Sequence, residues 1–150
     1  MISYTVTDDT PLALVTLTEA KAQLRVTHTH EDTVITGCID TAIIMAEDYL
    51  SRSLHKRNVL VKTSTFTNCY KLERTPLLGD VVIKYRDIDN TEQTLSSANY
   101  TVKFDGLEPV IYYLDETTLP TVYDRYDAVT LTYSIGYDAA ANVPKPIKQY

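Results

Sequence analysis

The residues best suited to chemistry in this sequence are two histidines and their acidic neighbours, in the run His28-Thr29-His30-Glu31-Asp32. A His-x-His pair with nearby carboxylates has the ligand types that hold a divalent metal. However, the histidines flank a predicted turn and do not share a helix face, and the spacing supplies no third strong ligand. We interpret the run as a solvated turn and helix cap, with a metal-dependent enzyme using His28, His30 and Asp32 as an alternative.

Adjacent acidic residues are the other candidates for chemistry. General acid–base catalysis needs two carboxylates in different environments across a cleft, whereas carboxylates adjacent in sequence usually form solvated faces or helix caps. The pairs are Asp8-Asp9, Glu31-Asp32, Glu47-Asp48 and Asp115-Glu116. The sequence also has no glycine-rich phosphate loop and no nucleophile elbow. We therefore predict a protein that is not an enzyme, with no catalytic residues, metal or cofactor.

The charge of the chain argues against nucleic-acid recognition. Its 150 residues carry a net charge of −6 and a sequence pI near 4.9, whereas nucleic-acid readers present clustered basic surfaces. The strongest basic cluster is His55-Lys56-Arg57 with Arg52. It follows a predicted helix, where cations offset the negative end of the helix dipole.

The cysteines and the apolar runs predict a soluble protein made in a reducing cytoplasm. Cys38 and Cys69 form no metal-binding or disulfide motif, and Cys38 is expected to be a small core residue. The N-terminus lacks the features of a signal peptide. The longest apolar stretch, at 42–46, is too short to cross a bilayer.

Periodicity predicts helices first and strands afterwards. A short helix is expected from Thr18 to Val26, capped by Thr18, and a long helix from Glu31 to Leu54 with apolar residues every three or four positions. Ile44 and Met45 widen its apolar stripe, which indicates either a contact with a second protein or a broad internal core. Alternating patterns then predict strands at 59–66, 81–86, 92–95, 100–104, 110–114 and 128–135.

These elements predict an α+β protein of one domain, residues 1–150. The helical part, 1–57, is a hairpin-like core of a short and a long helix. The β part, 58–137, is an antiparallel sheet or small barrel, and the segment 138–150 begins a C-terminal helix at the end of the chain. Tyrosines gather in the β part and include Tyr112 and Tyr113. Tyrosine is favoured where one end of the side chain is buried and the other is exposed to solvent. These tyrosines therefore indicate either a protein contact or ordinary strand positions.

Six segments, taken in order, resemble the head–tail connector (adaptor, or head-completion) proteins of long-tailed phages. They are VTLTEAKAQLRV at 15–26, AEDYL at 46–50, VIKYRD at 82–87, TLSSANY at 94–100, VTLTYSIGY at 129–137 and VPKPIKQ at 143–149. Each motif is mostly an apolar pattern, and the ordered set covers nearly the whole chain. Similar proteins continue beyond the Ile-Lys-Gln segment into a full amphipathic helix, and contacts of that helix lie outside this sequence.

The resemblance implies a structural subunit of the virion neck. The partners that it implies are further copies of the chain in a closed ring of twelve, the portal protein above and a stopper or tail-completion protein below, with no membrane. Genomic DNA would pass through the channel without sequence-specific binding, and acidic subunits would repel its phosphates.

A closed ring needs two different complementary patches on each subunit. The candidate subunit-interface residues are Ile44, Met45, Asp48, Tyr112 and Tyr113. The candidate portal-binding residues, carried over from the family, are Lys145, Pro146, Ile147, Lys148, Gln149 and Tyr150. The other alternative is a ligand- or glycan-binding β module of a virion, which would require a concave aromatic pocket.

Overall fold

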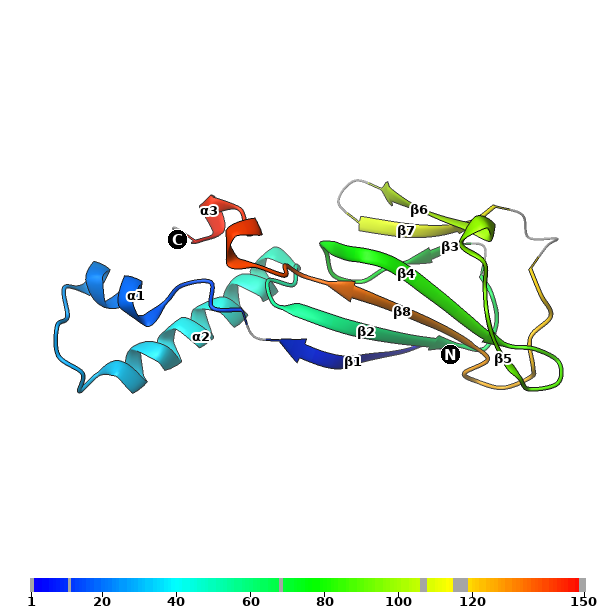
Figure 1. Ribbon diagram of the computed structural model, residues 1–150, viewed down its shortest axis with the longest axis horizontal. Helices are drawn as coiled ribbons and strands as arrows, with labels where there is room; N and C mark the ends of the chain where they lie inside the picture. The colour runs from blue at the N-terminus through cyan, green and yellow to red at the C-terminus, as the bar shows by residue number, and fades with distance from the viewer. Residues whose placement is uncertain (1, 11, 68, 106–107, 115–118, 149–150) are drawn as a thin grey trace.

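The computed structural model describes residues 2–10, 12–67, 69–105, 108–114 and 119–148. The molecule is elongated, with the helices at one end and the β-sheets at the other (Figure 1). The α+β class and the antiparallel sheets predicted from the sequence are confirmed.

Local capping signals set the ends of the helices. Helix α1 spans Leu17–Leu24, and its N-cap is Thr16, two residues before the predicted Thr18. The Thr16 hydroxyl accepts from the Glu19 N–H at 3.2 Å, and the Glu19 carboxylate accepts from the Thr16 N–H at 2.7 Å. Helix α2 spans Asp32–Leu50 and stops before the predicted Leu54, because Ser51 adopts a left-handed φ of 50°.

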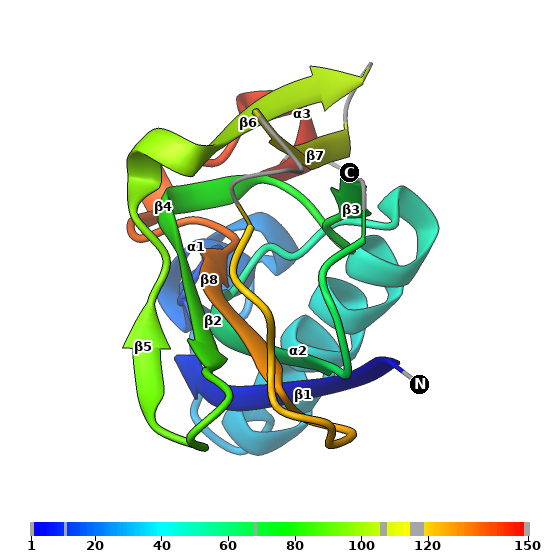
Figure 2. The ribbon, with the colours of Figure 1, turned by 90° about the vertical axis from the view of Figure 1, so that its right-hand side faces the viewer.

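Within the described residues, eight strands form two antiparallel sheets. The larger sheet has the order β1-β2-β8-β4-β5, and the smaller has the order β3-β7-β6 (Figure 2). The strands of the larger sheet are β1 Ile2–Thr10, β2 Lys56–Thr63, β4 Leu77–Arg86, β5 Glu92–Thr94 and β8 Val129–Ile135. Those of the smaller are β3 Cys69–Lys71, β6 Tyr100–Asp105 and β7 Glu108–Tyr113. Short 3-10 turns η1 (Ser97–Asn99) and η3 (Ala140–Asn142) precede β6 and helix α3 (Lys145–Lys148).

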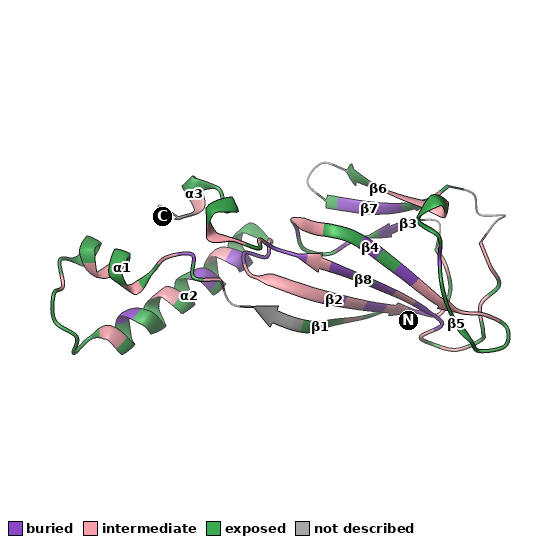
Figure 3. Cartoon of the chain, viewed as in Figure 1, coloured by how far each residue is buried: buried purple, intermediate pink, exposed green. Residues whose placement is uncertain are grey.

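The main core lies between the two sheets. Every second residue is buried in β8 and, from Val59 onward, in β2, as in Val61 and Leu131, so these strands present one mainly apolar face inward. Tyr70 and Ile111 cover that face from the smaller sheet. Figure 3 shows the resulting contrast, with buried residues concentrated in the strands and exposed residues along α1 and α2.

Two strands were missed by the sequence analysis. Residues 1–57 were assigned to the helical part, but Ile2–Thr10 forms the edge strand β1, antiparallel to β2, and Lys56 and Arg57 already belong to β2. The alternation of Ile2, Tyr4 and Val6 was a strand signal in the sequence. Strand β3 has only three residues, which is too short for a periodic pattern.

Candidate docking surfaces

The outer face of α2 carries a column of exposed acidic and apolar side chains. Asp40, Ile44 and Asp48 lie four residues apart, so they share one side of the helix, and Met45 lies beside them. Ile44 is 56% exposed and Met45 67%, and both aspartates are exposed. The described residues give neither aspartate an ion pair. The interface candidates Ile44, Met45 and Asp48 are therefore brought together on one accessible surface.

A second apolar surface lies between α1 and α2. It is an open groove of about 930 Å³, lined by Val34, Cys38 and Ala42 of α2, by Leu24 of α1 and by Ile147 of α3, among others. The groove exists because α1 buries none of its own residues and leaves this flank of α2 uncovered. Cys38 is exposed here, so its predicted place in the core is wrong.

A buried ion pair fixes the helical end to the sheets. Glu47 is only 3% exposed. One carboxylate oxygen accepts from the N–H of Leu54 at 2.6 Å and of His55 at 3.1 Å, and the other lies 3.0 Å from the Arg57 guanidinium. We expected Glu47 on a solvated face, and this is wrong, because β2 brings Arg57 back against it. Arg57 does lie beside the last turn of α2, but as the ion-pair partner of Glu47.

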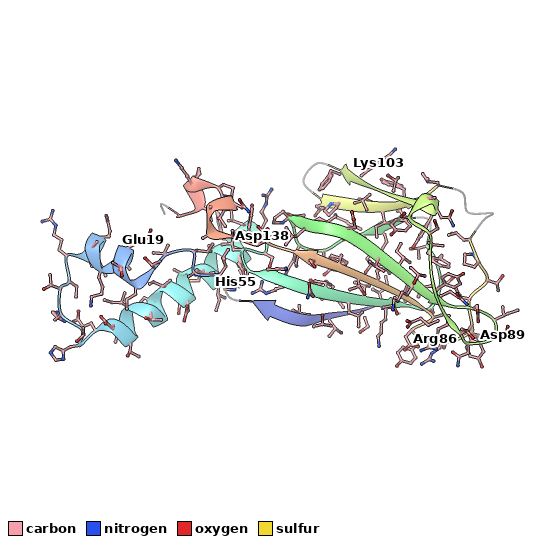
Figure 4. The ribbon with its side chains drawn as sticks, in the orientation of Figure 1. Glu19, His55, Arg86, Asp89, Lys103 and Asp138 are labelled. Atoms are coloured by element: carbon pink, nitrogen blue, oxygen red, sulfur yellow. The ribbon has the colours of Figure 1, made fainter. Side chains whose placement is uncertain are left out.

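A close backbone contact lies next to this joint. Gly136, which follows β8, has a φ of 93°, and a Cβ placed there would be 1.9 Å from the His55 carbonyl oxygen. Only glycine fits this conformation and this spacing. Figure 4 labels His55 at the junction of the two halves, with Asp138 close to it in the same view.

The histidine run forms a turn, as the sequence analysis interpreted it. The His28 and His30 ring centroids are 5.8 Å apart, and Asp32 bonds to the Lys21 ammonium at 2.5 Å. His28 lies 3.9 Å from a Glu31 oxygen. Within the described part of the chain, no group of three or more potential ligands could hold a metal ion.

The two tyrosine candidates face opposite sides of β7. Tyr112 is 38% exposed on the outer side of the smaller sheet. Tyr113 points inward, where its ring meets Phe66 edge-on with centroids 5.4 Å apart. Burial raises the pKa of Tyr113 from 10.0 to about 12. Only Tyr112 of the pair is accessible for an interface, and the exposed Leu114 beside it was not singled out from the sequence.

The portal-binding candidates lie on and after α3. Lys145 and Pro146 are exposed, whereas Ile147 is half-buried and packs against a small cluster that contains Leu14, Ile43 and Val143. Lys148 ends α3, and Gln149 and Tyr150 lie outside the described residues. This segment therefore has a basic, solvent-facing side and an apolar side turned toward the groove.

The outer face of the larger sheet carries paired charges. A hollow of about 300 Å³ is lined by Lys62, Lys84, Glu92 and Asp127, among others. Lys84 bonds to Glu92 at 2.8 Å and holds the pKa of that carboxyl below its ordinary value. Tyr85 is the aromatic residue among its described lining. The aromatic pocket required by the glycan-binding alternative is thus not formed by these described residues.

No helix in the described residues is long and apolar enough to span a membrane. Exposed apolar surfaces at one end and a well-buried sandwich core at the other are typical of a subunit that works by docking.

Comparison with known proteins agrees with this class. Residues 14–112 match the family described as phage gp6-like head-tail connector protein. The chain belongs to this family, and the resemblance found in its sequence is confirmed. It is a structural protein rather than an enzyme, as the sequence analysis predicted. A search of curated protein sequences gave no significant match.

Solved structures share the fold. A chain from the neck of an empty gene transfer agent particle, computed with C6 symmetry, has a TM-score of 0.72 at 15% identity, covering 95% of this chain and 75% of that one. A chain from the virion of a native gene transfer agent particle has a TM-score of 0.68 at 16% identity, covering 94% and 75%. A third, from a native neck computed with C12 symmetry, has a TM-score of 0.63 at 17% identity, covering 93% and 74%.

Proposed function

We propose that this chain is the adaptor subunit of a phage neck, forming a closed ring beneath the portal through which the genome passes. The observation that carries the proposal is the family match over residues 14–112. The neck chains with a similar fold come from particles computed with C6 and C12 symmetry, which supports a ring of twelve copies in the virion.

The two ends of the molecule supply the different patches that a cyclic ring requires. Heterologous contacts join one patch of a subunit to another patch of its neighbour. The column with Ile44, Met45 and Asp48 is the first, and the outer side of the smaller sheet, with Tyr112, is the second. Tyr113 supports the second patch from inside. In this proposal residues 1–150 act as one unit, because the Glu47–Arg57 pair joins the helical and β parts.

The axial partners are the portal protein on one side and a stopper or tail-completion protein on the other. The exposed Lys145 and Pro146 place a basic segment on the surface near the helical end, and this position supports portal binding by residues 145–150. The net charge of −6 supports a channel that DNA crosses without adhering to its wall.

The test is assembly with the portal protein, followed by mass photometry and electron microscopy. Wild-type chain is expected to form rings on the portal, and Ile44→Asp to abolish them by placing a charge in an apolar contact. Ile88→Asp is the matched control, because Ile88 is also exposed but lies in the β4–β5 turn at the far end. Absence of the wild-type chain from assembled necks would contradict the proposal.

A further inference from the structure

We propose that neighbouring copies of this chain recognise one another by opposite charges, with Asp48 on the outer face of α2 in one copy against Lys103 of the smaller sheet in the next. This inference rests on the proposed ring and adds the groups that select the contact. The two patches cannot meet within one chain, because α2 and the smaller sheet lie at opposite ends and on opposite edges of the molecule (Figure 1).

The first patch carries negative charge that the fold leaves unpaired. Helix α2 contains four acidic residues and no lysine or arginine. Asp32 and Glu47 are held by cations of the same chain. Asp40 and Asp48 are exposed on the outer column, and the described residues give neither of them an ion pair. These two carboxylates are therefore available to a cation of another subunit.

The position of Asp48 is electrostatically unfavourable for the isolated chain. It lies in the last turn of α2, where the terminal carbonyl groups give the helix end a partial negative charge. A carboxylate at that end is repelled, and the turn contains no basic residue to offset the repulsion. A cation supplied by a neighbouring subunit would offset both negative charges at once.

The second patch carries the complementary charge. Lys71 of β3 and Lys103 of β6 both pair in register with Val110 of β7, so the two lysines share the outer face of the smaller sheet. Tyr112 lies on the same face, two residues along β7. Lys71 is paired with Glu108. Lys103, labelled at the outer edge of this sheet in Figure 4, is exposed and has no ion pair among the described residues.

Exposed apolar side chains accompany the charge on both patches. Ile44 precedes Asp48 by one helical turn, and Tyr112 lies one register position from Lys103 along the sheet. Apolar contact around an ion pair excludes water, so the two charges attract more strongly than they would at an open surface.

The same charges select the direction of the contact. Two α2 columns brought face to face would bring the aspartates of both copies together and repel. The outer face of α2 against the outer face of the smaller sheet instead joins unlike charges. This contact is head-to-tail, which is the type that a closed ring requires.

The first experiment reverses the charges and measures assembly on the portal protein by mass photometry. Asp48→Lys alone and Lys103→Glu alone should each weaken ring assembly about tenfold or more, because every interface then brings like charges together. The two substitutions combined in one chain should restore assembly, because every interface of the ring regains an opposite pair.

Asp89→Lys serves as the matched control. Asp89 is also exposed, but it lies in the β4–β5 turn at the far end of the molecule (Figure 4). This change should leave assembly as in wild type. Combined with Lys103→Glu, it gives the same net charge as the restoring pair but should not restore assembly. Thermal melts check folding, since Asp48→Lys places a favourable charge at the end of α2 and should melt no lower than wild type.

Cys69 provides a second measurement that needs no substitution. It is exposed on β3 and pairs in register with Tyr112, so it lies on the outer face that the contact should cover. Maleimide labelling of Cys69, followed by mass spectrometry of its peptide, should be slower in wild-type rings than in the free chain.

The outcomes separate this inference from the proposed function. If wild-type rings form, the inference is overturned by failure of the Asp48–Lys103 double reversal to assemble, by equal assembly of the Asp89 combination, or by unchanged labelling of Cys69. It is also overturned if either single reversal assembles like wild type, and loss with Asp48→Lys alone would show that another protein covers the outer face of α2. Absence of wild-type rings would contradict the proposed function and this inference together.

Discussion

The two ends of this molecule differ in how much of their apolar surface they bury. Among the described residues, the cluster between the sheets contains twelve buried residues, whereas the cluster under the helices contains four. Helix α1 buries none and α2 only Ile35, Ile43 and Glu47. Folding free energy is therefore concentrated in the β end, and the helical end leaves more of its apolar side chains exposed to solvent.

The largest expected effect on the free energy of unfolding is at the Glu47–Arg57 pair, which joins the two ends. Glu47→Ala would remove the carboxylate that lies 3.0 Å from the largely buried Arg57 guanidinium, and with it the acceptor for the Leu54 and His55 N–H groups. Breaking a buried pair in this way costs about 3–5 kcal/mol. Urea denaturation followed by circular dichroism measures the loss.

Glu47→Gln is the matched control, since it keeps an acceptor oxygen while removing the charge, and it should lose less stability. If Glu47→Ala lowered the free energy of unfolding by less than about 1 kcal/mol, the Glu47–Arg57 pair would contribute no more than an exposed surface ion pair does. The two ends would then not be coupled through it.

The contrast between the ends is tested directly by one pair of leucines. Leu131→Ala removes a fully buried side chain of β8 and should cost about 2–5 kcal/mol. Leu24→Ala removes an exposed side chain of α1 and should change stability by less than about 0.5 kcal/mol. Equal losses in urea denaturation would show that the helical end is as tightly packed as the sandwich.

A further effect on stability is expected at alkaline pH, from a tyrosine of the β end. Because burial raises the pKa of Tyr113 to about 12, the folded state holds its proton more tightly than the unfolded state, whose value is near 10. This contribution is complete below pH 10 and is lost as the pH rises through about 12. In thermal melts over this range, wild type should therefore lose stability relative to Tyr113→Phe, since phenylalanine has no proton to lose.

Sequence reasoning succeeded where a pattern is local and strict. The alternation of Val59 and Val61 in β2, and of Val129 and Leu131 in β8, matches strands that are buried on one face. The polar turn at His28 and His30 likewise separates α1 from α2. In each case the neighbours along the chain decide the structure.

Prediction from the sequence failed where a residue's burial or partner depends on segments distant along the chain. Cys38 has the spacing of a core residue, but α1 is too short to cover it. Glu47 looks like half of a solvated acidic pair until β2 brings Arg57 against it. The end of α2 was predicted too late in the chain, because it ends at a serine in the left-handed conformation, and the usual sequence signal for that conformation is a glycine. The docking surfaces were only partly predicted for the same reason.

The direction of strand β1 has a practical consequence. It runs antiparallel to β2, from the far end of the sandwich toward the helices, so Ile2 lies at the opposite end of the molecule from α1 (Figure 1). Helix α3, in contrast, lies beside the helical end. Gold labels attached ahead of Ile2 and after α3 would therefore mark the two ends of each subunit, and the orientation of the subunit in an assembled particle could be determined from a low-resolution micrograph.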